Sequence, residues 1–201
     1  MKKTNEKGAT LMEIIGVLGI LGMVAMGLLS GIDNVHTKIR LAKGYEETKN
    51  IVKAMRQTFS AFRPANTKAK TLWELGIFNN CIPDSGEKCT GGENEYANNA
   101  LGLKMEIVMP TPEQSKFAAN DPTFKLIYYG VDPKTCVDLL TSDWGNDPSS
   151  GLAEISIEDG TPFQWPKDCT SGCHDLPPEM ENVQTECTRA KTVNISWEYY
   201  F

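Results

Sequence analysis

The chain has little positive charge and few histidines for its length. Its 201 residues include 20 lysines and arginines against 26 aspartates and glutamates, which gives a formal net charge of -6 at pH 7, and only two histidines. Nucleic-acid affinity depends largely on a basic surface that neutralises phosphates. The sequence therefore disfavours direct nucleic-acid binding.

Motifs for catalysis and metal binding are also scarce. No Gly-x-Ser-x-Gly elbow accompanies His174, so a nucleophilic triad lacks its usual context. Cys169, Cys173 and His174 offer soft ligands for zinc, but the chain has no C-x-x-C pair. The acidic turns at 143–147 and 158–160 do not match a twelve-residue calcium loop. We expect no enzymatic activity, no metal site and no cofactor.

Charge is missing from one long segment near the amino terminus. The 19 residues of Ile14–Ile32 are all uncharged. Ala9–Ile32, taken as a helix, is long enough to cross a hydrocarbon core of about 30 Å. Three lysines precede it, and the positive-inside rule then predicts a cytoplasmic amino terminus and an exported body. The residues after Ile32 make a poor signal-peptidase site, so we expect this segment to be retained in the protein.

The residues just before this segment carry a recognisable motif. Gly8 is followed by Ala9, Thr10, Leu11, Met12 and Glu13, and this run resembles the prepilin-peptidase site of type IV pilins and pseudopilins. The resemblance implies cleavage after Gly8, N-methylation of Ala9 as the mature first residue, and Glu13 as the acid at its fifth position. The chain departs from the commonest pattern at Ala9, where many members of the family have Phe or Met.

Glu13 is the one acid within Ala9–Ile32. An ionisable residue beside a membrane span is costly and marks a functional site by default. The resemblance implies that Glu13 pairs with the Ala9 amine of a neighbouring subunit, a pair whose disruption would cost about 3–5 kcal/mol. The alternative is an ordinary signal anchor in which Glu13 only reaches the lipid headgroups.

An amphipathic pattern continues beyond the apolar segment. Apolar residues recur mostly every three or four positions from Val35 to Phe62, which predicts a helix that ends before Pro64. Within it, Met55, Phe59 and Phe62 are expected to lie in the core of a head domain. We divide the chain into a leader peptide (1–8), an apolar transmembrane and filament-core helix (9–32), an amphipathic stalk helix (33–63) and a globular head (64–201).

The head combines short helices and strands. The pattern predicts a helix at 71–75, strands at 105–109 and 123–129, a proline-started helix within 131–140 and a terminal strand at 192–201. A strand, a helix with a cysteine, a long irregular region, a second cysteine and a terminal strand resemble the head of type IVb pilins of the toxin-coregulated and conjugative thin-pilus groups. We expect an α+β fold in which a long amino-terminal helix packs on an antiparallel sheet with a disulfide-bonded carboxy-terminal region.

Six cysteines lie on the polar side of the apolar segment. An even number in an exported domain indicates up to three disulfides among 15 possible pairings. The type IVb resemblance implies a bridge between Cys136 and Cys187. The simplest remaining local pairs are Cys81 with Cys89 and Cys169 with Cys173.

The resemblance implies a structural role. It predicts a pilin that forms a helical homopolymer, with prepilin peptidase, the inner membrane and the pilus assembly machinery as partners before it reaches the extracellular pilus. The filament would serve adhesion, aggregation, motility or conjugative mating. The alternatives are a pseudopilin, a minor pilin, and a signal-anchored periplasmic binding or enzymatic domain.

Overall fold

The computed structural model describes residues 11–59, 68–83, 89–92, 95–111, 113–117, 121–144 and 148–201. Within the first helix it describes the side chains of Ile15 and of the residues from Val35 onward. The chain divides into two compact units, Met1–Arg40 and Leu41–Phe201. One helix, α1 (Leu11–Phe59), supplies residues to both. The expected boundaries at residues 8, 32 and 63 refer to roles in processing and assembly, and they stay predictions.

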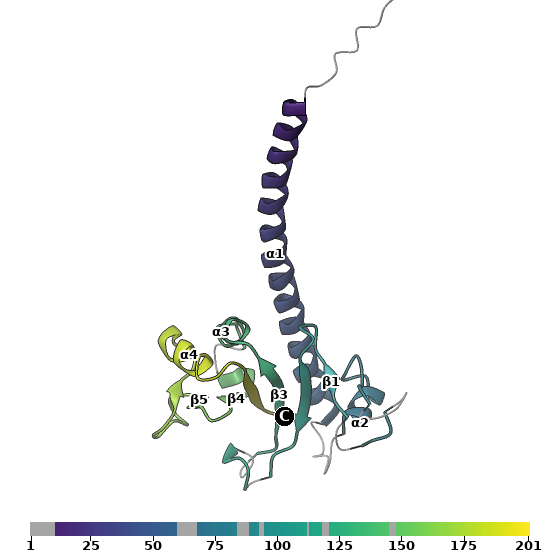
Figure 1. Ribbon diagram of the computed structural model, residues 1–201. Coiled ribbons are helices and arrows are strands. Elements are labelled where there is room, and N and C mark those ends of the chain that lie inside the picture. Colours follow the sequence, from purple (N-terminus) through teal and green to yellow (C-terminus); the bar gives the residue numbers. More distant parts are fainter. Residues whose placement is uncertain are drawn as a thin grey trace, which may run out of the picture. The chain divides into compact units, whose positions relative to one another are not determined.

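The second unit joins one mixed sheet to short helices (Figure 1). The strands lie in the order β1-β2-β3-β7-β4-β5-β6, so the last strand in the sequence occupies the centre. Neighbouring strands are antiparallel except for β5 and β6, which are parallel. After α1, the elements are α2 (Ala69–Glu74), β1 (Ala97–Asn98), β2 (Lys104–Val108), β3 (Thr123–Val131), α3 (Pro133–Leu140), the 3-10 turn η2 (Pro148–Ser150), β4 (Leu152–Ile157), β5 (Phe163–Gln164), β6 (His174–Asp175), α4 (Met180–Cys187) and β7 (Val193–Tyr200).

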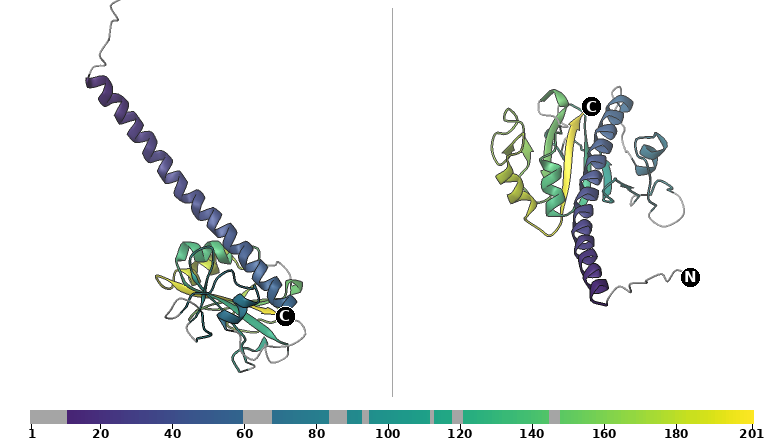
Figure 2. Two further views of the ribbon diagram at one scale, coloured as in Figure 1. Left: turned by 90° about the vertical axis from the view of Figure 1, so that its right-hand side faces the viewer. Right: turned by 90° about the horizontal axis from the view of Figure 1, so that it is seen from above.

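The last part of α1 packs on one face of this sheet (Figure 2). Its buried residues recur at helical spacing, which directs a single stripe into the core: Thr48, Ile51, Val52, Met55 and Phe59. Thr48 shares a hydrogen bond with the Tyr128 hydroxyl on β3. Burial raises the pKa of Tyr128 to about 12, so this hydroxyl keeps its proton at physiological pH.

Strand β7 shows why the sheet has one apolar face. Alternate side chains point to opposite faces, and Val193, Ile195, Trp197 and Tyr199 are all buried. The indole ring of Trp197 lies 5.1 Å from the Tyr128 ring and 4.7 Å from the Trp144 ring. These aromatic contacts fill the space between the sheet and the elements on its face.

Arg56 links α1 by hydrogen bonds to the end of β7 and to η2. Its Nε donates to the Tyr200 carbonyl at 2.9 Å and its Nη1 to the Ser150 carbonyl at 2.8 Å. Gly151 has φ +77°, and a Cβ atom there would lie 1.5 Å from Arg56 Nη2. This position therefore requires glycine for both its backbone conformation and the space it leaves.

The α+β fold expected from the sequence is confirmed, with corrections in detail. The predicted strands at 105–109, 123–129 and 192–201 correspond to β2, β3 and β7, and the proline-started helix is α3. The helix expected at 71–75 begins earlier, at Ala69, and ends at Glu74. Met55 and Phe59 lie in the core as expected, whereas Phe62 and the predicted helix end before Pro64 fall outside the described residues.

The prediction of a long irregular region between α3 and Cys187 is wrong. It contains three strands and a helix, and β4 pairs directly with β7 from Leu152 to Ile157. These strands form through tertiary pairing. Strand β4 pairs with the central strand β7, and β5 and β6, each two residues long, continue the sheet beyond β4. Such short pairings have no sequence period of their own.

Candidate functional site

The residues of the processing motif lie at the amino-terminal end of the chain. Gly8 and Ala9 precede the described residues, whereas Glu13 is the third residue of α1. The side chain of Glu13 lies outside the described part of the structure, so its role in assembly stays a prediction.

Three apolar side chains of α1 in the first unit are strongly exposed. The exposed fractions are 57% for Ile15, 57% for Val35 and 46% for Ile39. Val35 and Ile39 are four residues apart and therefore share one face of the helix. In the part of the chain that the structure describes, no helix has both the length and the apolar character that a membrane crossing requires.

The carboxy-terminal part of the second unit is held by a long-range disulfide. Cys136 on α3 is bonded to Cys187 on α4, and both side chains are fully buried. Asp132 begins α3 by accepting hydrogen bonds from the backbone N–H groups of Lys134 and Thr135, each at 3.1 Å. The cap and the disulfide fix the position of α3 beside α4.

Local disulfides close two shorter loops. Cys81 is bonded to Cys89, and Cys169 to Cys173. The Sγ atoms of Cys81 and Cys89 lie near a carboxylate oxygen of Glu95, all within 4.8 Å of one another. Disulfide sulfurs have no thiolate to offer a metal, and Glu95 already accepts from the N–H groups of Thr90 and Gly91. The cluster therefore acts as a loop closure.

Next to Cys187, the buried carboxylate of Glu186 joins three segments. Its side chain is 1% exposed, and it accepts a hydrogen bond from Arg189 Nη2 at 2.9 Å and one from the Thr161 N–H at 3.1 Å. His174 Nε2 on β6 lies 3.2 Å from the same carboxylate. Burial alone would raise the pKa of Glu186, but the hydrogen bonds from Arg189, His174 and Thr161 outweigh it and hold the pKa below its usual value.

Replacement of Glu186 by glutamine should destabilise the fold in a pH-dependent way. A carboxyl with a lowered pKa stabilises the folded state above its unfolded pKa of about 4.3, and this contribution disappears as the pH falls through the folded pKa. We expect E186Q to lower the free energy of unfolding by about 2 kcal/mol at pH 7 and by less at pH 3, measured by urea unfolding of the full chain. An equal loss at both pH values would contradict this account, and E179Q, at an exposed position before α4, is the control.

A second buried carboxylate lies on the opposite face of the sheet. Glu198 on β7 is 1% exposed, and its Oε1 accepts from Ser115 Oγ at 2.6 Å and from Thr123 Oγ1 at 2.7 Å. Lys125 Nζ lies 3.1 Å from its Oε2. Oε1 thus holds Ser115 of the 113–117 segment onto the sheet, whereas Oε2 accepts no hydrogen bond among the described residues and is balanced by the Lys125 ammonium.

Comparisons with known proteins agree with this geometry. No family model matches the chain. The chain is 27% identical over 143 residues to the toxin coregulated pilin of Vibrio cholerae serotype O1, a match that covers 70% of this chain and 59% of that protein. The fold matches the crystal structure of a type IV b pilin from Salmonella typhi with a TM-score of 0.50 and 17% identity, over 82% of this chain and 99% of that chain. Both matches are to pilins, and together they support a type IV pilin assignment for this chain.

The chain spans 59% of the length of the curated relative that it matches. The sequence pointed to the cysteines and to a processing motif that stays a prediction, but it gave no sign of the Glu186 and Glu198 networks. Apart from Arg189, three positions from Glu186, the partners described above lie far away in the sequence, as Thr161, His174 and Ser115 do. Local spacing could therefore reveal at most the pair of Glu186 with Arg189.

The exposed aromatic surface of α2 was also missed. Trp73 is 46% exposed and Leu75, just after the helix, 51% exposed. Both lie in a segment whose helical pattern was visible, but the pattern alone could not show that Leu72 enters the core while Trp73 remains outside. An exposed Trp is a residue type that is enriched among the strongest contacts of protein interfaces.

Proposed function

We propose that this pilin is the structural subunit of an extracellular type IV pilus. The observation that carries the proposal is the combination of a type IV pilin fold with the Gly8-to-Glu13 motif before a long uncharged segment. The fold supplies a head, and the uncharged helix supplies an apolar surface that only association can remove from water. Association of many copies gives a homopolymer, so the function is assembly and no reaction is required.

The proposed route to the filament rests on the resemblance of the amino-terminal sequence to the pilin processing motif. The precursor is anchored in the inner membrane by residues 9–32, prepilin peptidase cuts after Gly8, and Ala9 is N-methylated. The assembly machinery then transfers the apolar helix from lipid to the filament core. In that core the Glu13 carboxylate pairs with the Ala9 amine of a neighbouring subunit, which sets the register between subunits.

The exposed apolar residues support this account. Val35 and Ile39 on α1, and Trp73 and Leu75 at α2, are costly to leave in water. Each Å² of apolar surface that is removed from water contributes about 25 cal/mol of favourable free energy. Contacts that cover these side chains in a polymer are therefore favourable. Trp in particular contributes strongly to protein interfaces when a partner covers it.

Shearing of cells separates this proposal from its alternatives. We expect the chain to be the main protein in filaments sheared from the cell surface and collected by sedimentation. A chain found only as a trace component of such filaments would be a minor pilin, and one confined to the envelope fraction would be a pseudopilin or an anchored periplasmic domain. Either result would contradict a role as the main pilus subunit.

A further inference from the structure

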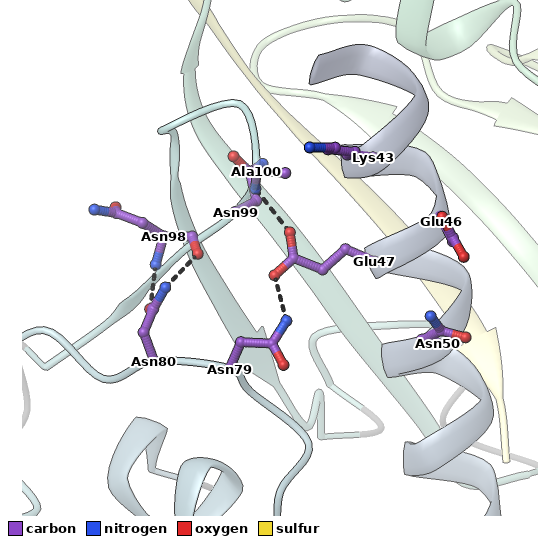
Figure 3. Close-up of a pocket in the computed structure, with 9 residues that line it drawn as sticks. All are labelled: Lys43, Glu46, Glu47, Asn50, Asn79, Asn80, Asn98, Asn99 and Ala100. Atoms are coloured by element: carbon purple, nitrogen blue, oxygen red, sulfur yellow. Dashed lines mark hydrogen bonds between the residues drawn. The ribbon is translucent and has the colours of Figure 1, made fainter. Parts of the chain in front are cut away.

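The second unit contains a polar groove to which the proposed function assigns no role. The groove has a volume of about 420 Å³ and lies between α1 and the loops around β1 (Figure 3). One wall is a single face of α1, at positions 43, 46, 47 and 50, and the other is formed by the residues at 79–80 and 98–100. The lining residues are Lys43, Glu46, Glu47, Asn50, Asn79, Asn80, Asn98, Asn99 and Ala100.

Hydrogen bonds across the groove hold the two walls together. Glu47 on α1 accepts from the Ala100 N–H at 2.7 Å and from Asn79 Nδ2 at 3.2 Å, as Figure 3 shows. On the far wall, Asn80 Nδ2 donates to the Asn98 carbonyl and Asn80 Oδ1 accepts from the Asn98 N–H, each at 2.9 Å. The groove is therefore formed before any ligand arrives, which lowers the entropic cost of binding.

Several polar groups of the groove retain capacity for further hydrogen bonds. Asn79 uses one N–H, which leaves its second N–H and its carbonyl oxygen. The side chains of Lys43 and Asn50 have no hydrogen-bonding partner among the described residues. The groove thus presents amide donors, amide acceptors and an amine beside a fixed carboxylate.

The lining excludes most other ligand classes. An extended peptide needs apolar pockets for its side chains, and the lining offers only the methyl group of Ala100. A phosphate would face the two carboxylates of Glu46 and Glu47 with Lys43 as the single cation. In the part of the chain that the structure describes, no set of three metal-ligating groups lies here.

We propose that this groove binds a neutral saccharide. Each sugar hydroxyl both donates and accepts, as does each asparagine amide, so Asn50 and Asn79 can engage adjacent hydroxyls while Lys43 donates to a third. No aromatic ring lines the groove for stacking, so we expect weak binding, with a dissociation constant on the order of 1 mM. The proposal concerns the folded subunit and does not depend on polymerisation.

Saturation-transfer NMR on the full chain tests the proposal. The subunit is solubilised in a zwitterionic detergent without a sugar headgroup, and lactose and maltose are titrated separately. Lactose represents galactoside-terminated surface glycans, and maltose represents a glucose polymer. We expect saturation transfer to at least one of the two sugars. The sugar that responds shows whether the groove prefers galactoside-terminated glycans or glucose polymers. Transfer to neither sugar would overturn the proposal.

A pair of variants ties the signal to the groove. Asn50 is exposed, and its replacement by alanine should leave the fold intact while weakening sugar binding at least fivefold. Gln184→Ala removes an equally exposed amide from α4, outside the groove, and should leave binding unchanged. Equal losses in N50A and Q184A, or none in N50A, would show that the sugar does not bind in the groove and would overturn the assignment.

Discussion

Replacement of both Cys136 and Cys187 by alanine is expected to lower the free energy of unfolding by about 4 kcal/mol. The two residues are 51 positions apart in the sequence, and in the chain-entropy model a bridge over such a loop restricts the unfolded chain by this amount. Few domains have a stability much larger than 5–15 kcal/mol. The double variant should therefore show a much lower urea midpoint and yield few filaments.

The bridge between Cys169 and Cys173 provides the matched control. It spans only four positions, so its removal by a double alanine replacement should cost about 2 kcal/mol in the same model. Unfolding of both double variants by urea, followed by circular dichroism, compares the two losses. Equal losses would mean that loop length does not determine the contribution of the long bridge, in conflict with this account.

Replacement of Glu13 by alanine is expected to block filament assembly without affecting the head. In the proposed core, the variant would leave the Ala9 amine charged and without its carboxylate, at a cost of about 3–5 kcal/mol per subunit. That energy corresponds to a loss of at least a hundredfold in the equilibrium for subunit addition. We expect sheared filaments to fall below detection while the precursor accumulates in cells at normal levels.

The control for this experiment is an acid away from the proposed core. E179A, in the head at an exposed position, should assemble like the unaltered chain. Immunoblots of sheared and cell-associated fractions measure both variants. Normal filament yield from E13A would refute the role of Glu13 in assembly.

Local patterns in the sequence were sufficient for some elements of the fold and not for others. Strand β7 alternates polar and apolar residues to Tyr200, and α3 begins with Asp132 and Pro133, so both elements have strong local signals. Helix α4 has no side-chain cap at Glu179, and only Met180, Val183 and Cys187 supply its apolar positions. Its place in the fold depends on the disulfide to α3 and on the Glu186 network, which are long-range contacts.

The candidate functional residues also differ in whether the sequence alone reveals them. Gly8 and Glu13 are candidates because the family motif that they resemble is short and contiguous, which a single sequence can display, and their roles stay predictions. Cysteine spacing alone left 15 pairings open, and the expected bridge between Cys136 and Cys187 came from the family resemblance. The groove at Asn50 and Asn79 brings together residues 29 positions apart, so only the folded chain reveals it.

The central claim is that this chain is a processed pilin that polymerises, and the intact mass of the subunit in sheared filaments tests it most directly. The account predicts a chain that begins at Ala9, carries one added methyl group and has lost six hydrogens through three disulfides, as seen by comparison with the reduced form. A chain that keeps Met1 to Gly8 and is found only as a membrane-bound monomer would contradict the account.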